Sequence, residues 1–220
     1  MKDEIRIVSE HFSKDVFVID MQDRINIGLN AWEKRVIEKY FKKGASILNI
    51  GCGPGREAFA LYDLGYKIIG IDISEEELKI AKKGAMETRR DILFEITNGL
   101  DLCFPDESFD YIVMWAQAFG NVYGYENQIH LLKECHRVLK AGGMMSYSGH
   151  YYKTVKEECG VYVDGKKFYA IAETDCYWEL FTMEEMIGLN NDSSFKTVEC
   201  LNAAELGYEY DTVIICNVQK

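Results

Sequence analysis

The chain has 220 residues, 48% of them hydrophobic, with 25 basic and 36 acidic side chains and a formal net charge of −11. This length and apolar content can bury one substantial core, so we expect a single domain over residues 1–220. The acidic balance repels phosphate backbones and anionic lipid headgroups, which argues against nucleic acid and membranes as partners.

The first residues, MKDEIRIVSEHF, scatter charges among apolar side chains. This pattern is unlike a signal peptide or a membrane anchor, so we expect a cytoplasmic protein. The seven cysteines are odd in number and form no CxxC pair. We therefore expect neither a disulfide framework nor a metal site.

Apolar residues recur at helical spacing over residues 29–41, and Gly44 is a suitable C-terminal stop. Ser74 with Glu77 three residues later is typical of a capping box at a helix start. Predicted strands and helices then alternate in this order: SILNI, REAFALYDLG, KIIGID, SEEELKIAKKGAMET, ILFEI and FDYIVMW.

A helix is expected over residues 126–140, ended by Gly142 and Gly143 and followed by the strand MMSYS. Because parallel strands need crossover connections, the alternation of strands and helices predicts a mostly parallel sheet with helices on both faces.

The pattern changes after residue 150. The segment VYVDGKKFYAIAE places two alternating runs around Asp164 and Gly165, which indicates an antiparallel hairpin. TMEEMIGLN reads as a short helix with Thr182 as N-cap, and FKTVECL and DTVIICNVQ read as two final strands.

Three glycines, Gly51, Gly53 and Gly55, lie between the first predicted strand and the next helix. Open α/β sheets bind ligands at such turns, where residues without a Cβ let a ligand approach main-chain N–H groups. We therefore expect a nucleoside-bearing ligand. The alternative is a tight turn that requires glycine for its geometry alone.

Asp72 ends the second predicted strand, where a carboxylate can accept both hydroxyls of a ribose. Its alternative role as a helix N-cap is better filled by Ser74. A dinucleotide fingerprint would require glycine where this chain has Arg56, and a side chain there hinders close packing around a pyrophosphate. This argues against a nicotinamide dinucleotide dehydrogenase.

Three segments carry a family resemblance: ILNIGCGPGREAFALYDLGYKIIGIDIS, LDLCFPDESFDYIVMWAQAFGNV and HLLKECHRVLKAGGMM. They resemble, in order and spacing, the motifs of class I S-adenosylmethionine-dependent methyltransferases, in particular the type 11-like branch that acts mainly on small molecules. The resemblance covers residues 46–148.

The resemblance implies an α/β, Rossmann-like sheet of seven strands in the order 3-2-1-4-5-7-6, with the last strand antiparallel. Within it, residues 1–44 would form an N-terminal helical cap and residues 45–150 the cofactor-binding core. Residues 151–181 would form the inserted hairpin, as a lid or a structural element, and residues 182–220 the closing helix and strands.

The resemblance also implies S-adenosyl-L-methionine as cofactor and S-adenosyl-L-homocysteine as product. The expected contacts are as follows: Gly51, Cys52, Gly53 and Gly55 with the methionine part, Asp72 with the ribose, Ile73, Asn98, Gly99 and Leu100 with the adenine, and Trp115, Ala116 and Gln117 along the methyl-transfer gap. Asn49 stands where relatives usually have an acidic residue, near the amino group of the cofactor. Cys52 reads as a small apolar filler rather than a nucleophile.

Methyl transfer from a sulfonium requires mainly a nucleophile held in line and the exclusion of water, and a general base only when the acceptor is protonated. His150, predicted at the carboxyl end of the fifth strand, is our candidate base. Its alternative role is packing or hydrogen bonding. His11 lies in the N-terminal segment, which in relatives often folds over the cofactor.

Aromatic side chains near the expected mouth of the sheet could line a pocket for a small apolar or cationic acceptor, although each could instead pack the hairpin onto the sheet. With His11, the candidate pocket residues are Phe119, Tyr123, Tyr151, Tyr152, Tyr177 and Trp178. Tyr125, Tyr162 and Tyr169 belong to the same aromatic group.

The favoured hypothesis is methyl transfer to a small molecule by a monomer or homodimer. One alternative is a protein that binds S-adenosylmethionine or its product without catalysis, as a sensor or partner subunit. A dehydrogenase is the remaining alternative.

Overall fold

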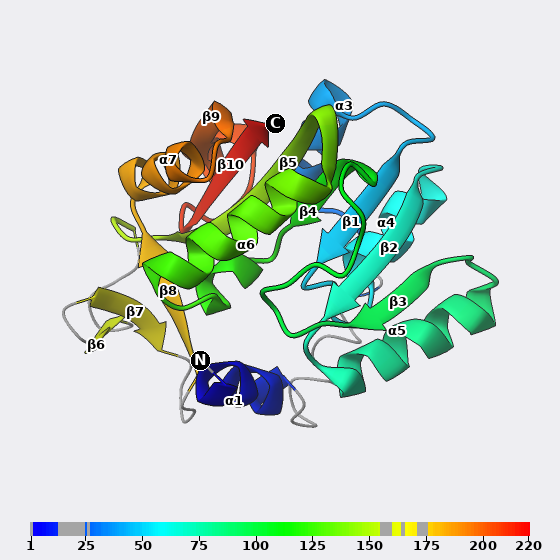
Figure 1. The fold of residues 1–220 in the computed structure, drawn as a ribbon, viewed down its shortest axis with the longest axis horizontal. Coiled ribbons are helices and arrows are strands. Elements are labelled where there is room, and N and C mark those ends of the chain that lie inside the picture. Colours follow the sequence, from blue (N-terminus) through cyan, green and yellow to red (C-terminus); the bar gives the residue numbers. More distant parts are fainter. Residues whose placement is uncertain (1, 13–24, 26, 155–159, 164–165, 171–175) are drawn as a thin grey trace.

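The computed structural model describes residues 2–12, 25, 27–154, 160–163, 166–170 and 176–220. A single twisted sheet forms its centre, with helices on both faces (Figure 1). The seven main strands are β1 (Ser46–Ile50), β2 (Lys67–Asp72), β3 (Leu93–Ile96), β4 (Phe109–Met114), β5 (Leu139–Tyr151), β9 (Lys196–Asn202) and β10 (Val213–Gln219).

These strands lie in the order β3-β2-β1-β4-β5-β10-β9. The pairs from β3 to β5 are all parallel, whereas β10 is antiparallel to both of its neighbours, β5 and β9. Since β9 and β10 are the sixth and seventh strands of this sheet along the chain, the predicted order 3-2-1-4-5-7-6 with an antiparallel last strand is confirmed.

The helices divide between the two faces. On one face, α3 (Ala31–Tyr40), α4 (Arg56–Asp63) and α5 (Glu75–Thr88) bury Trp32, Leu61 and Leu78 against the sheet. On the other face, α6 (Tyr125–Val138) and α7 (Met183–Asp192) bury Leu131 and Met186. The predicted Thr182 N-cap of α7 is confirmed, since its hydroxyl accepts from Glu185 N.

One helix end was predicted wrongly. The helix expected to run to residue 140 ends at Val138, and residues 140–143 form an irregular excursion of β5. Gly142 has a positive φ of 75°, and a β-carbon on Gly143 would lie 2.9 Å from the Asp110 carbonyl oxygen. The two glycines therefore shape a bulge inside the strand rather than a helix terminus.

The hairpin after β5 is confirmed, but its third strand was missed. Strands β6 (Gly160–Val163) and β7 (Lys166–Ala170) pair antiparallel, while their predicted turn at residues 164–165 lies outside the described residues. Strand β8 (Tyr177–Phe181) pairs antiparallel with β7 and parallel with the end of β5. The hairpin thus extends the sheet at the carboxyl end of β5.

Helix α1 (Lys2–Phe12) lies beyond the carboxyl ends of β1 and β2 (Figure 1). Its Ser9 hydroxyl donates to the Ile73 carbonyl oxygen at 3.0 Å, just after β2. At the end of the helix, the ring of Phe12 lies 6.4 Å from that of Trp178 in β8. The helix therefore connects two segments that are far apart in the sequence.

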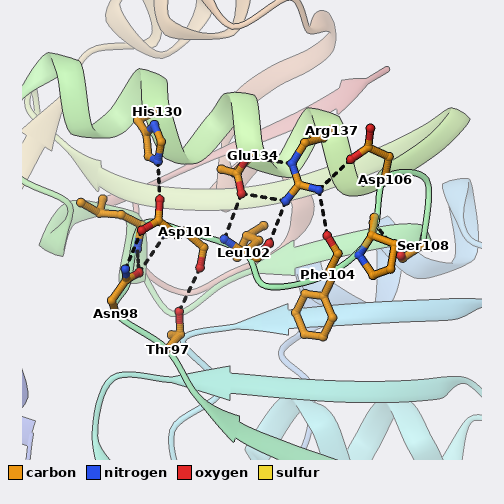
Figure 2. A network of polar contacts seen from close by, with 12 residues as sticks. Thr97, Asn98, Asp101, Leu102, Phe104, Asp106, Ser108, His130, Glu134 and Arg137 are labelled. Atoms are coloured by element: carbon orange, nitrogen blue, oxygen red, sulfur yellow. Dashed lines mark hydrogen bonds and ion pairs between the residues drawn. The ribbon is translucent and has the colours of Figure 1, made fainter.

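Arg137, near the end of α6, binds the loop that leads into β4 (Figure 2). Its guanidinium donates to both carboxylate oxygens of Glu134, each at 2.8 Å. It also donates to the carbonyl oxygens of Leu102 and Phe104 and to the Asp106 carboxylate, at 2.7–2.8 Å. All five guanidinium N–H groups are thereby used, which gives the motifs FPDESF and HRVLK a shared structural role.

The six described cysteines are free thiols. None of the helices in the described part of the chain combines the length and the apolar character that a membrane span requires.

Candidate active site

The glycine turn, residues 51–55, follows β1 and takes conformations that favour glycine. Gly51, Gly53 and Gly55 have φ values of 66°, 50° and 99°. A β-carbon on Gly51 would lie 2.8 Å from Cβ of Ala118. On Gly55 it would lie 3.0 Å from the ring of Phe59. Internal geometry thus requires these glycines, and their contact with a ligand stays a prediction.

Asp72 joins the glycine turn to the end of β2. Its Oδ2 accepts from Gly53 N at 2.8 Å, and its Oδ1 accepts from Ser74 N at 2.9 Å. Burial raises the pKa of this carboxyl, against the opposite effect of the backbone N–H groups. Each carboxylate oxygen keeps a lone pair for a further donor such as a ribose hydroxyl.

Ser74 is the N-cap of α5, as predicted, because its hydroxyl accepts from Glu77 N at 3.3 Å. The reciprocal half of the expected capping box is absent among the hydrogen bonds of the described residues. Asp72 takes the Ser74 N–H that Glu77 would have accepted. The Glu77 side chain is buried instead beside Gly53, which the sequence did not predict.

Three predicted adenine residues, Asn98, Gly99 and Leu100, lie on the loop after β3, next to Ile73 at the end of β2. A β-carbon on Gly99 would lie 3.1 Å from a methyl group of Ile73, so these two residues are in contact. The side-chain Oδ1 of Asn98 accepts from Leu100 N at 3.0 Å and from Asp101 N at 2.8 Å (Figure 2). Asn98 therefore shapes this turn, and a bond from adenine would compete with it.

Helix α6 holds the adenine loop from outside. His130 Nε2 lies 2.8 Å from one Asp101 carboxylate oxygen, and the Asn98 amide donates to the other at 2.7 Å. Glu134 accepts from Leu102 N at 3.0 Å. The same helix thus fixes Asn98 through Asp101 and the following residues through Arg137.

Two of the predicted cofactor residues are deeply buried near the glycine turn. Asn49 is 1% exposed, and its Oδ1 has no hydrogen-bond partner among the described residues. Cys52 packs against Gly70, and burial raises the pKa of its thiol well above the usual value. Such a thiol stays protonated, consistent with an apolar filler.

The turn after β4 is strained. Ala116 and Gln117 have φ values of 51° and 59°, and Gln117 N donates to Ser148 Oγ at 3.0 Å. Left-handed non-glycine residues persist where surrounding contacts enforce them, often at functional sites. The indole of Trp115 turns inward instead and donates to Ser146 Oγ at 2.9 Å. This corrects the placement of its side chain along the methyl-transfer gap.

The mouth cluster comprises His11, Phe12, His150 and Trp178. The His150 ring lies 5.3 Å from Trp178 and the His11 ring 4.9 Å from Phe12, both edge-on. The structure therefore brings together three predicted site residues from α1, β5 and β8. Burial lowers the pKa of His150 from 6.5 to about 4. The imidazole is neutral at pH 7 and only weakly basic.

The other predicted pocket residues separate into core and rim. Phe119 is fully buried, with its ring 4.9 Å from that of Tyr147, so its assignment to an open pocket is corrected. Tyr123 donates to the Tyr177 carbonyl oxygen at 2.5 Å and so ties the loop before α6 to β8.

Tyr151 is half-buried and Tyr152 is 38% exposed, both at the end of β5. The Tyr125 hydroxyl donates to Asp192 on α7. The side chains of Tyr162 and Tyr169 lie outside the described residues.

Arg56 takes part in a buried ion network instead of facing the glycine turn. It donates to both carboxylate oxygens of Glu33 at 2.7 and 2.9 Å, to the Gly28 carbonyl oxygen at 2.7 Å and to Glu57 at 2.5 Å. The network ties α3 to α4. Arg56, which stands where a dinucleotide fingerprint has its third glycine, therefore packs α4 against α3.

Within the described residues, His, Cys, Asp and Glu side chains do not gather in a group of three that could hold a metal ion.

Residues 47–143 match the model of a family described as a methyltransferase domain.

Among sequence relatives, a demethylmenaquinone methyltransferase from Symbiobacterium thermophilum is 33% identical over 150 residues, which cover 61% of this chain and 57% of the relative. The chain spans about half the length of the curated relatives it matches.

Two solved structures illustrate the likeness in fold. A SAM-dependent methyltransferase from Methanosarcina mazei has a TM-score of 0.69 at 23% identity, over 88% of this chain and 98% of that one. The 1,6-didemethyltoxoflavin-N1-methyltransferase from Burkholderia thailandensis, with bound S-adenosylhomocysteine, has a TM-score of 0.72 at 15% identity, over 98% and 88%. At these identities the likeness concerns the fold alone. In its matched domain, its strand order and its motif order, the chain is similar to the class I S-adenosylmethionine-dependent methyltransferases.

Proposed function

We propose that this protein transfers the methyl group of S-adenosylmethionine to a small-molecule acceptor. The observation that carries the proposal is Asp72, buried at the carboxyl edge of the sheet and bonded across the glycine turn to Gly53. The match of residues 47–143 to the model of a methyltransferase domain supports the choice of cofactor. The proposed enzyme is cytoplasmic and a monomer or homodimer.

The buried acceptor atoms fit this cofactor. Asp72 offers carboxylate lone pairs to the ribose hydroxyls, and Asn49 Oδ1 is an acceptor for the ammonium of the methionine part. A buried acceptor without a partner costs about 1–3 kcal/mol, so a ligand that supplies the donor gains this energy on binding. Ile73 and Gly99 would contact the adenine.

The cofactor supplies an electrophilic methyl group, so the protein has to bind, orient and exclude water. Helix α1 would cover the sulfonium side, because Ser9 and Phe12 dock it on both β2 and β8. Neutral His150 would orient the acceptor by a hydrogen bond rather than remove its proton, and we therefore expect no inflection in the pH–rate profile near pH 6.5 from this residue.

We propose that the acceptor carries a flat, apolar ring. Phe12 and Trp178 offer aromatic faces at the mouth, and such faces favour ring stacking. One relative acts, by its name, on demethylmenaquinone, whose ring system is of this kind. The net charge of −11 supports a small molecule over nucleic acid. We propose that the hairpin over residues 151–181 acts as a lid over the acceptor.

The test begins with the cofactor. Calorimetry should detect binding of S-adenosylhomocysteine in the micromolar range. Asp72→Ala should weaken it more than about tenfold, the loss expected from two charge-assisted hydrogen bonds. Asp91→Asn, at an exposed position, is the matched control. Failure of the intact protein to bind would refute the proposal.

Turnover separates the enzyme from a non-catalytic binding protein or partner subunit. Tritiated methyl transfer is measured over a panel of hydroxylated aromatic rings, reduced quinones and aliphatic amines. Labelled product from an aromatic acceptor supports the proposal. Binding of the cofactor without transfer to any acceptor would favour the non-catalytic alternative.

A further inference from the structure

Glu77 is a buried carboxyl that the proposed cofactor contacts do not use. It lies in the first turn of α5 and is 4% exposed. Among the described residues, its Oε1 has no hydrogen-bond partner. Burying a polar atom in this state is costly, and such groups commonly have a functional reason.

The Glu77 carboxyl meets Asp72 at the glycine turn. A β-carbon on Gly53 would lie 3.1 Å from Glu77 Oε2 and 3.7 Å from its Cδ. The N–H of the same glycine donates to Asp72 Oδ2. Two carboxyls, one from the end of β2 and one from α5, therefore contact a single glycine of the turn that is expected to face the cofactor.

The two carboxyls differ in protonation. Burial, then repulsion from Asp72 and Glu57, raises the pKa of Glu77 to about 8. The charged and titratable groups around it are Asp72 on β2, Glu57 on α4, which pairs with Arg56, and the Cys52 thiol. No cation among the described residues pairs with Glu77. At pH 7 it carries a proton, whereas Asp72 accepts two backbone hydrogen bonds as a carboxylate does.

A vicinal diol suits this pair, because each hydroxyl both donates and accepts a hydrogen bond. Asp72 can only accept, while a protonated Glu77 can donate as well as accept. We propose that Glu77 is a second ribose-binding residue, which donates a hydrogen bond to one hydroxyl of the cofactor diol while Asp72 accepts from the diol. This inference rests on the proposed cofactor and specifies how its sugar is selected.

The experiment compares residue and ligand deletions in one thermodynamic cycle. Dissociation constants are measured by calorimetry at pH 7 for S-adenosylhomocysteine and for its 2′-deoxy and 3′-deoxy analogues. The proteins are the wild type, Glu77→Met, which keeps the shape without a hydrogen-bonding group, and Glu77→Gln, which imitates the protonated carboxyl. Glu75→Gln, on the exposed side of the same turn, is the control.

We expect Glu77→Met to weaken binding of the product about tenfold and Glu77→Gln to stay within about threefold of the wild type. One of the two deoxy analogues should bind the wild type about tenfold more weakly than the product, but bind Glu77→Met as well as the product does. Unchanged affinity in Glu77→Met, or strictly additive losses for both analogues, would overturn the inference.

A measurement on the wild type alone covers the case in which Glu77→Met does not fold. The ratio of product to deoxy-analogue affinity should fall as the pH rises through about 8, since Glu77 then loses the donated proton. The α-amino group of the ligand titrates equally in both compounds and cancels in the ratio. A ratio that does not change with pH contradicts the inference. Failure of the wild type to bind any of the ligands would instead refute the proposed function, and this inference with it.

Discussion

The glycine turn and the mouth cluster are held in place by different kinds of contact. The turn follows β1 at the centre of a continuous parallel strand pairing from β3 to β5, and Asp72 bonds it to the end of β2. At the mouth, β5 and β8 pair at His150 and Leu180, whereas α1 is attached by side-chain contacts that include the ring of Phe12 and the hydrogen bond from Ser9 to the loop after β2. Main-chain pairing fixes a position more tightly than side-chain contacts, so we expect the cofactor end to be rigid and the α1 side of the acceptor end to be adaptable.

This difference agrees with the chemistry proposed for each end. One cofactor has to be bound in one orientation, whereas the acceptor varies among relatives whose names specify different compounds. The following variants test whether stability resides in the first region and acceptor turnover in the second.

The largest effect on stability is expected at Arg137, outside the mouth. Arg137→Met removes five hydrogen bonds, to Glu134, to Asp106 and to the carbonyl oxygens of Leu102 and Phe104, which should cost about 2–3 kcal/mol after allowance for partial exposure and for the donors that Glu134 and Leu102 keep. The measurement is the urea midpoint. Lys133→Met, at an exposed position of the same helix, should change it little. Equal midpoints for Arg137→Met and the control would mean that the network contributes no net stability.

The sequence predicted the region of the glycine turn better than the region of the mouth cluster. The Ser74 and Thr182 caps and the position of Asp72 at the end of β2 came from local periodicity or motif spacing, whereas the strand order came from the family resemblance. Strand β8 was missed because YWELF lacks the alternation of polar and apolar residues that indicates a strand, although it pairs with β7 nearby in the chain and with the end of β5. Trp115 was misplaced because sequence does not tell which way a side chain turns at a strand end.

Two further differences between the prediction and the structure have local causes. Residues 142–143 look like a helix stop but form a strand bulge, because glycine suits both. The buried side chain of Glu77 was concealed by its fit to a capping box, and only the bond from Ser74 to Asp72 shows that the box is incomplete. A signal was present in the sequence: Asp72 and Ser74 compete for the same helix start.

The second largest effect depends on pH. In the folded protein the pKa of Glu77 is raised from 4.5 to about 8, so the folded state keeps a proton that the unfolded state loses. The stability from this proton is fully present below pH 4.5 and is lost as the pH rises through 8. Glu77→Gln cannot lose a proton, so at pH 9 it should be more stable than the wild type by on the order of 1–3 kcal/mol.

Unfolding by urea at pH 5 and pH 9 measures this effect. The two proteins should differ little at pH 5, and Glu75→Gln should follow the wild type at both values. A variant that is less stable than the wild type at pH 9 would show that the Glu77 carboxylate has a favourable partner in the folded state.

A smaller stability effect with a clear functional effect is expected at Trp178. Trp178→Ala removes the ring that contacts both Phe12 and His150, on β8 rather than on the glycine turn. Turnover of an aromatic acceptor should fall about tenfold, with the affinity for S-adenosylhomocysteine within about threefold. Tyr210→Ala, an exposed aromatic truncation, is the control. Loss of cofactor affinity equal to the loss of turnover would contradict the separation of the two regions.

The smallest effect is expected at Ser9, where a single hydrogen bond joins α1 to the loop after β2. Ser9→Ala leaves the Ile73 carbonyl oxygen without this donor, at a net cost of about 0.5–1.5 kcal/mol. Because this bond exists only when α1 is docked, the cost should appear as more frequent opening of the helix, by roughly two- to tenfold. Hydrogen exchange of the α1 amides measures the opening directly. Arg6→Gln removes an exposed ion pair within the same helix and serves as control, since such pairs contribute little. If Ser9→Ala leaves exchange in α1 unchanged, the hydrogen bond to Ile73 does not hold the helix, and its position depends on other contacts, among them the ring contact of Phe12 with Trp178.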